Sequence, residues 1–289
     1  MEGTKALAFP VNKGQSLKVQ EEETKGLPIL NWTAWKTDGL WFQAQFRLPG
    51  LTVIQTSDAD LATNLQKLLS ECQKMAPDFL DGSQSFKAET KLEFNSEFGF
   101  GSSSTLVSNL AYWSEIDPFT LQQTVLGGSG YDIACARSKG PLFYQLMNKM
   151  PVVDKVELNF TFSENIYFVY LGHKQRTSES IEVFKQRAHF DNQQLQQISD
   201  ISIAISKCNK LDEFEKLLEE HEAVLSSILE ITPVKRRLFS DHRGVVKSLG
   251  AWGGDFVLMT STLTETEFKL YLNKIGFDTF FTWEKLILK

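Results

Sequence analysis

The sequence predicts an α+β fold, in which strands and helices intersperse without the regular repeat of a doubly wound sheet. Two observations support this class. Residues 27–56 look like an antiparallel hairpin, and along the rest of the chain strand-like segments alternate with helix-like segments. A length of 289 residues can form one large domain or two smaller ones. We place a boundary near residue 152, because Lys149-Met150-Pro151 separates a glycine-rich half from a second strand–helix set.

The first half contains the clearest periodic signals. Turn residues at Asp38-Gly39 and Pro49-Gly50 divide the apolar stretch 27–56 into strands. Leucines at helical spacing predict a helix over residues 58–75, and a strict apolar–polar alternation predicts a half-buried strand over 86–94. Two further helices are expected, over residues 103–113 and from Asp117-Pro118 onward.

The second half repeats the mixture of strands and helices. The expected elements are strand-rich residues 155–171, helices at about 179–206 and 210–230, a β-like run at the end of 242–260, a helix at about 264–275 and an aromatic strand at 277–283.

Composition excludes several classes of function. With 42% hydrophobic and 23% charged residues the chain is an ordinary globular protein, and its net charge of -6 argues against a general nucleic-acid binder. The three cysteines are widely spaced, which favours a reducing cytoplasm. Since no apolar run reaches the roughly 18 residues of a membrane helix and the start lacks a signal peptide, we expect a cytoplasmic protein without a membrane partner.

The first of three glycine-rich segments is Phe98-Gly99-Phe100-Gly101-Ser102-Ser103-Ser104, between an expected strand and an expected helix. Glycines let the backbone approach a ligand closely, and the start of a helix favours an anion. A serine hydroxyl there could also bind Mg²⁺. A glycine turn followed by a serine N-cap explains the same residues equally well.

The other two segments differ in how strongly they indicate a ligand. Gly127-Gly128-Ser129-Gly130-Tyr131-Asp132 ends on a carboxylate that a plain helix cap explains best, although it could also accept a proton or hold a metal beside a phosphate. Lys247-Ser248-Leu249-Gly250-Ala251-Trp252-Gly253-Gly254-Asp255 is dense in glycine just before an apolar strand. A long hairpin turn accounts for it less well than a backbone with a special role.

In their order and spacing, the three segments resemble the GHMP kinases, small-molecule kinases named for galactose, homoserine, mevalonate and phosphomevalonate. The resemblance spans most of the chain. It implies that Asp132 lies near the transferred phosphate as the catalytic residue. The residues implied to wrap the ATP phosphates are Gly99, Gly101, Ser102, Ser103 and Ser104, and those of the third loop, implied to lie against the same site, are Gly250, Ala251, Gly253, Gly254 and Asp255.

The resemblance also implies a fold and cofactors. It predicts an ATP-binding N-terminal domain at 1–152, like the second domain of ribosomal protein S5, and a ferredoxin-like C-terminal domain at 153–289. ATP and Mg²⁺ would be required, with Ser103 as the main protein ligand of the metal. The motifs are most similar to those of the phosphomevalonate kinase and mevalonate kinase branches, and Gly-Tyr-Asp-Ile-Ala resembles a bacterial subgroup named by those letters.

Three departures from the family pattern stand out. The chain starts where the relatives have already completed a first strand, so that strand is expected to be missing. Leu121 stands where the mevalonate kinase branch has a metal-binding glutamate, and Trp252 replaces a glycine of the third loop.

Substrate contacts are expected from residues near these segments: Ser129, Gly130, Lys174, Arg176 and Lys247. A phosphorylated substrate would favour such cations, although a solvated loop explains Lys174 and Arg176 equally well. The resemblance thus predicts an ATP-dependent kinase that phosphorylates phosphomevalonate, or else mevalonate, as a monomer or homodimer. The alternatives are a degenerate homologue that binds nucleotide without transferring phosphate, and a related ATP-consuming decarboxylase.

Overall fold

The computed structural model describes residues 3–24, 26–172, 191–250 and 255–288, and every structural statement below concerns these residues. The chain forms two compact units. Unit 1 consists of Met1–Asn12, Glu97–Gly99 and Ser138–Lys289, and unit 2 consists of Lys13–Ser96 and Phe100–Arg137.

The division differs from the expected boundary near residue 152. That position lies inside strand β8 (Met150–Lys155), which pairs antiparallel with β7 (Leu142–Met147) in unit 1. Asn148 and Lys149 both have positive φ, at 51° and 63°, as the tight turn of a two-residue hairpin requires. Lys149-Met150-Pro151 therefore marks a hairpin rather than a linker.

Unit 2 is built on a five-stranded sheet in the order β2-β6-β3-β4-β5. Its strands are β2 (Gln15–Glu22), β3 (Ile29–Lys36), β4 (Gly39–Arg47), β5 (Thr52–Thr56) and β6 (Ser85–Leu92). The β3–β6 pair is parallel and the other pairs are antiparallel. The hairpin at Asp38-Gly39 and the alternating strand near residues 86–94 are confirmed.

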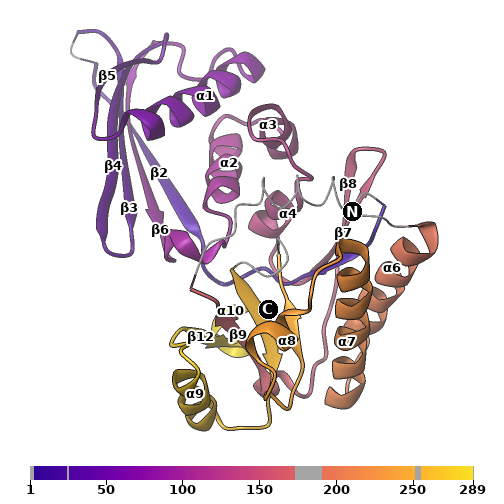
Figure 1. Cartoon of the computed structure of the whole chain (residues 1–289). Coiled ribbons are helices and arrows are strands. Elements are labelled where there is room, and N and C mark those ends of the chain that lie inside the picture. The colour runs from indigo at the N-terminus through magenta and orange to yellow at the C-terminus, as the bar shows by residue number, and fades with distance from the viewer. Residues whose placement is uncertain (1–2, 25, 173–190, 251–254, 289) are drawn as a thin grey trace. The chain divides into compact units, whose positions relative to one another are not determined.

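Helix α1 (Ala59–Met75) lies on one face of this sheet (Figure 1). The Asp58 side chain caps it by accepting hydrogen bonds from the backbone N–H groups of Asp60 and Leu61. Its apolar stripe includes Leu65 and Leu69, which join the sheet residues in one buried cluster. Burying each such leucine contributes roughly 1.5–3 kcal/mol to stability.

Three shorter helices complete unit 2. These are α2 (Ser102–Trp113), α3 (Pro118–Val125) and α4 (Tyr131–Arg137). The Asp117 side chain caps α3 by accepting a hydrogen bond from the Thr120 N–H group. Pro118 lies in the first turn, where the sequence predicted that a helix begins. Helix α2 contacts both of the other two helices, and α1 contacts α2 and α3, so the four helices of unit 2 pack together.

Unit 1 contains two sheets. The smaller has the order β1-β7-β8, with β1 at Ala6–Ala8. The larger has the order β10-β11-β9-β12 and is antiparallel throughout. Its strands are β9 (Ile166–Tyr170), β10 (Val246–Ser248), β11 (Phe256–Thr260) and β12 (Phe280–Thr282). Numbered along the chain this order is 2-3-1-4, which agrees with the expected ferredoxin-like arrangement.

The helices of unit 1 flank the larger sheet or connect its strands. They are α6 (Asn192–Ser206), α7 (Leu211–Leu229), α8 (Val234–Leu238), α9 (Glu265–Lys274) and α10 (Trp283–Leu286). The α6 and α7 helices run side by side (Figure 1). Asp191 and Gln194 form a capping box at the start of α6, and residues 173–190 of the longer expected helix lie outside the described residues. None of the described helices is long and apolar enough to cross a membrane.

A partly buried histidine in α7, His221, gives the fold a testable pH dependence. Burial, with a smaller effect of the nearby Lys247 ammonium, lowers the pKa of His221 to about 3. The unfolded imidazole takes up a proton near pH 6.5, so between pH 6.5 and 3 the unfolded state binds more protons than the folded state. Stability therefore falls as the pH drops through this window, by up to about 1.4 kcal/mol per pH unit for this group.

We expect His221→Gln to remove this component of the pH dependence. The measurement is the free energy of unfolding in urea at pH 6, 5 and 4, for the natural chain and the variant. The variant should show the shallower decline with falling pH. Equal slopes for the two proteins would contradict a depressed pKa at His221.

Candidate active site

The start of helix α2 is an open backbone site. Its N-cap, Gly101, has φ 81° in the left-handed region and makes no side-chain capping hydrogen bond. The first intrahelical bond runs from Thr105 N–H to the Gly101 carbonyl. The first-turn N–H groups of Ser102, Ser103 and Ser104 therefore have no capping side chain, and the helix dipole favours an anion there.

Two hydrogen bonds to strand β2 hold this helix start in place. The Thr105 hydroxyl donates to Gln15 Oε1 at 2.8 Å, and Asn109 Nδ2 donates to the Gln15 carbonyl at 2.7 Å. Since these bonds join residues about ninety positions apart, they fix where the helix begins relative to the sheet. A preorganised row of N–H groups binds an anion without reordering the backbone.

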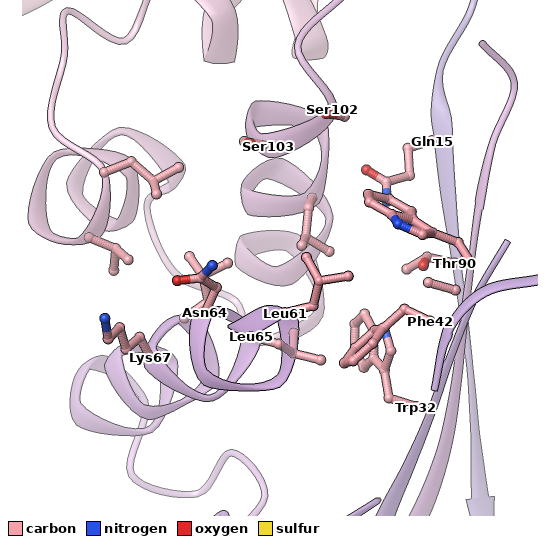
Figure 2. Close-up of a pocket in the computed structure, with 16 residues that line it drawn as sticks. Gln15, Trp32, Phe42, Leu61, Asn64, Leu65, Lys67, Thr90, Ser102 and Ser103 are labelled. Atoms are coloured by element: carbon pink, nitrogen blue, oxygen red, sulfur yellow. The ribbon is translucent and has the colours of Figure 1, made fainter. Parts of the chain in front are cut away.

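A cavity of about 340 Å³ lies beside the helix start, entirely within unit 2. Its walls come from the sheet, from α1 and from α2, and residues at the end of α3 line it as well. Figure 2 shows Trp32 and Phe42 on the sheet side, Leu61 and Leu65 on α1, and the two serines at the upper end of α2. The lining is mainly apolar, as is usual for small-molecule pockets.

A few polar groups enter this apolar cavity. Asn64 and Lys67 on α1 line it and are exposed, and Ser102 and Ser103 border it on α2 (Figure 2). An apolar slot with polar groups at its rim suits a flat heteroaromatic ring with a charged tail. The sequence pointed to the two serines at the edge of this cavity but not to the cavity itself, because the rest of its lining is spread over strands β2, β3, β4 and β6 and helices α1 and α3 with no shared motif.

The tryptophans of the sheet have different surroundings. Trp32 is buried in the core of unit 2, and it also lines the cavity. Trp41 packs against that core and also lines the cavity, whereas Trp35 is 36% exposed and does not line it. Trp32 and Trp41 therefore both border the cavity, and Trp41, the less buried of the two, offers a ligand more of its ring.

The second glycine segment forms a tight turn before α4. Gly127, Gly128 and Gly130 all have positive φ, a conformation that other residues rarely adopt. Asp132 is the second residue of α4 and is exposed, whereas the next residue, Ile133, is fully buried in the core. The turn thus places Asp132 on a firmly anchored helix, where its side chain keeps contact with water while burial among the surrounding protein atoms raises the pKa of its carboxyl above the usual value.

Residues at the end of helix α3 contact the glycine turn that precedes α4. Leu121 is fully buried in the core, so the position that the sequence flagged as lacking a carboxylate is a packing position. The adjacent Gln122 donates from Nε2 to the Gly127 carbonyl at 3.1 Å, and its Oε1 is buried without a hydrogen-bond partner. Sequence reasoning passed over Gln122, since no local pattern marks an amide that spans a turn.

In unit 1, Gly99 lies against the Asp255 carboxylate. Gly99 has φ 68°, and a Cβ placed on it would lie 2.5 Å from Asp255 Cγ. The preceding Phe98 ring contacts Tyr170, Phe256 and Phe281, at centroid distances of 5.0, 5.6 and 5.8 Å. The absence of a side chain at residue 99 is therefore what admits the carboxylate.

Of the third glycine segment, the structure describes residues 247–250 and Asp255. Gly250 follows β10 with φ 59°, and Leu249 N–H donates to the Phe256 carbonyl at 3.2 Å, which closes the hairpin base. Several expected site residues lie outside the described residues: Ala251, Gly253, Gly254, Lys174 and Arg176, together with Trp252.

Lys247 occupies a different place from the expected substrate contact. Its ammonium group lies 2.9 Å from Glu222 Oε2 and donates to the Ser248 carbonyl at 3.1 Å. Both side chains are buried, and burial lowers the pKa of Lys247 although Glu222 partly offsets the shift. The lysine is paired with protein atoms inside unit 1, so we assign it a structural role instead.

Among the described residues, no group of three or more His, Cys, Asp or Glu side chains could hold a metal ion. A metal in this region would therefore depend on serine hydroxyls, on one or two carboxylates and on the ligand itself, which is how Mg²⁺ is commonly bound beside phosphates. The three cysteines are free, as their spacing suggested.

Comparison with known proteins shows a clear structural likeness. No family model matches the sequence, and no curated protein matches it. Among solved structures, Methanococcus jannaschii mevalonate kinase has a TM-score of 0.66 at 14% identity, over 99% of this chain and 92% of its own. Streptococcus pneumoniae phosphomevalonate kinase, in complex with phosphomevalonate and AMPPNP, has a TM-score of 0.69 at 14% identity, over 98% and 94%.

Lactococcus lactis galactokinase, complexed with galactose, has a TM-score of 0.62 at 12% identity, over 99% of this chain and 88% of its own. The chain has the GHMP kinase fold. The α+β class that the sequence predicted is confirmed, and the likeness extends over nearly the whole chain.

The Gly99–Asp255 contact leads to a stability prediction. Gly99→Ala should destabilise unit 1 by about 1–2 kcal/mol for the left-handed φ, and by about a further 1–3 kcal/mol for displacing the carboxylate. Gly101→Ala is the matched control, because its φ is also positive but a Cβ there would lie 4.0 Å from the nearest atom, Ser104 Cβ.

The measurement is urea unfolding of each variant in the natural and the Asp255→Ala backgrounds. The extra cost of Gly99→Ala over Gly101→Ala should shrink when residue 255 is alanine. If the extra cost is the same in both backgrounds, the contact does not constrain residue 99.

Proposed function

We propose that this protein is an ATP-dependent small-molecule kinase of the GHMP type. The observation that carries the proposal is the apolar cavity of about 340 Å³, which ends at the uncapped, serine-rich start of α2. The cavity volume is within the usual range for small-molecule sites, and its two ends match the two ends of a nucleotide. The GHMP kinase fold supports the same conclusion.

The cavity suits the base, and the helix start suits the phosphates. Trp41, Phe42 and Leu61 provide flat apolar surface for a purine ring, and the Asn64 amide can both donate to and accept from its edge. The N–H groups of residues 102–104 can then donate to phosphate oxygens. Gly101, which has no side chain and a positive φ, leaves the approach to this helix open, and from the resemblance Gly99 is a further proposed phosphate contact.

The proposed chemistry is in-line transfer of the γ-phosphoryl group to an acceptor. When bound, ATP supplies that group and Mg²⁺ offsets its charge, with the exposed Ser103 hydroxyl as the protein ligand that we propose for the metal. The α2 amides hold the phosphates, and Asp132 orients the acceptor or takes its proton. A phosphate acceptor is largely ionised at pH 7 and needs little help from a base.

For the acceptor we propose phosphomevalonate first and mevalonate second. The support is the similarity of the segments around Asp132 and Asp255 to those kinases, together with the likeness to structures of both enzymes. Ser129, Gly130, Lys174 and Arg176 are the proposed substrate contacts. From the resemblance we also expect the third loop to lie against the phosphates through Gly250, Ala251, Gly253, Gly254 and Asp255.

A second candidate function is nucleotide binding without phosphoryl transfer. It is favoured by the buried Leu121, which leaves no carboxylate at the position where mevalonate kinases carry a metal-binding glutamate. Such a protein would bind ATP in the same cavity and leave it intact. Turnover distinguishes the two candidates.

The test of function is ADP release from ATP and Mg²⁺, with mevalonate and phosphomevalonate offered separately. We expect turnover on one acceptor, and a loss of at least about 100-fold in Asp132→Asn if Asp132 takes the proton. Asp58→Asn is the control, because asparagine caps α1 as well as aspartate does.

ATP binding without ADP release would favour the nucleotide-binding candidate, and release of CO₂ with ADP would identify a decarboxylase. If Asp132→Asn and Asp58→Asn both turn over like the natural chain, Asp132 is not catalytic.

Tryptophan fluorescence tests the place of the base. Binding of ATP should change the emission of Trp41, the less buried of the two tryptophans that line the cavity, so Trp41→Phe should lose a large part of the change that ATP causes, with Trp32 accounting for the remainder. Trp35→Phe should keep it, because Trp35 lies outside the cavity. A loss in Trp35→Phe with none in Trp41→Phe would place the base elsewhere.

A further inference from the structure

A buried polar cluster lies at the base of the third glycine segment, and the proposed chemistry makes no use of it. It consists of Glu222 on α7 and of Lys247 and Ser248 on β10, each less than a tenth exposed. All three belong to unit 1. Taking three such groups out of water has a cost that only complete pairing offsets.

Glu222 accepts from three donors in this cluster. Its Oε2 lies 2.9 Å from Lys247 Nζ and 3.3 Å from Ser248 N, and the Ser248 hydroxyl lies 2.9 Å from both of its carboxylate oxygens. Two of the three donors belong to Ser248, the last residue of β10. The carboxylate therefore holds the backbone as well as a side chain.

The position of β10 in its sheet explains why the backbone needs this partner. β10 is an edge strand, and it pairs with β11 over three residues, Val246 to Ser248. Leu249 N–H points to β11, because it donates to Phe256. Successive N–H groups alternate in direction along a strand, so Ser248 N–H points away from the sheet, where Glu222 takes the place of a neighbouring strand.

This contact comes directly before the loop. Ser248 is two residues ahead of Gly250, whose positive φ turns the chain out of the strand, and the loop returns to β11 at Phe256. A short edge strand with three pairs is easily frayed. Glu222 closes the open side of its last residue, while Leu249 closes the side that faces β11.

We propose that Glu222 is a positioning residue for the proposed kinase reaction, fixing the backbone from which the third glycine loop departs through its contacts with Ser248 and Lys247. The inference rests on the proposed function, since the loop is assigned to the phosphates there. Lys247 completes the arrangement by neutralising the carboxylate in its buried setting.

A carboxylate fits this role better than an amide does. Glutamate offers two acceptor oxygens to three donors, whereas glutamine offers one oxygen and an NH₂ group that would face a donor. Glu222→Gln keeps the size of the side chain but leaves Lys247 unpaired and at least one Ser248 donor unsatisfied. It is therefore a sharp test of the contact.

The first experiment is hydrogen exchange of backbone amides, which does not depend on activity. In Glu222→Gln we expect the Ser248 and Leu249 amides to exchange at least tenfold faster, with Val257 in β11 unchanged. Glu220→Gln is the matched control on the same helix, because Glu220 is exposed and bonds to Gln197 instead. Equal exchange at Ser248 in the two variants would overturn the proposal.

The second experiment is steady-state kinetics. Glu222→Gln and Ser248→Ala should lower kcat/KM for ATP at least tenfold, and Ser248→Thr, which keeps the hydroxyl donor, should restore most of it. Ser248→Ala also provides a milder change if Glu222→Gln fails to fold. A kcat/KM unchanged in Glu222→Gln and Ser248→Ala would overturn the positioning role.

Failure of the inference and failure of the proposed function give different results. A natural chain that releases no ADP contradicts the proposed kinase and, with it, a positioning role in that reaction, while exchange at Ser248 still decides whether Glu222 holds the base of the loop. An active natural chain with unaffected variants contradicts the inference alone.

Discussion

The two hydrogen bonds that Gln15 makes with helix α2 are the constraint on which the candidate site depends. They join strand β2 to Thr105 and Asn109, and so they determine where the uncapped first turn of the helix lies. The cavity beside that turn has walls on the same sheet and on α1. If α2 shifted by one residue, the serines would no longer border the cavity, because each step rotates a helix by about 100°.

A similar logic applies to the glycine turns, which are held by side chains from outside each turn. Gln122 spans the turn before α4, and Glu222 holds the strand that leads into the third segment. Glycine supplies the unusual backbone conformation at a cost in conformational entropy. A polar anchor at the edge of each turn offsets part of that cost and leaves the glycine backbone open toward a ligand.

Much of the fold could be predicted from local pattern. Helix α1, the β3–β4 hairpin and the start of α3 at Asp117-Pro118 follow from periodicity and from turn and cap chemistry, and the structure confirms them. Strand β2 was missed, because its residues are mostly polar and exposed and carry little apolar alternation. It is a strand because β6 provides a ladder of eight paired residues.

The candidate site, too, has a part that local sequence predicts and a part that only the folded structure shows. The sequence by itself determined the three glycine-rich segments and the serines at a helix start, because positive φ and free N–H groups depend on residue type and local order. The tertiary structure alone decided that Trp41 and Asn64 share a cavity with those serines, that Asp255 lies against Gly99, and that Lys247 is buried against Glu222. Each of these joins residues far apart in the chain, and no local pattern encodes which side chains a folded core brings together.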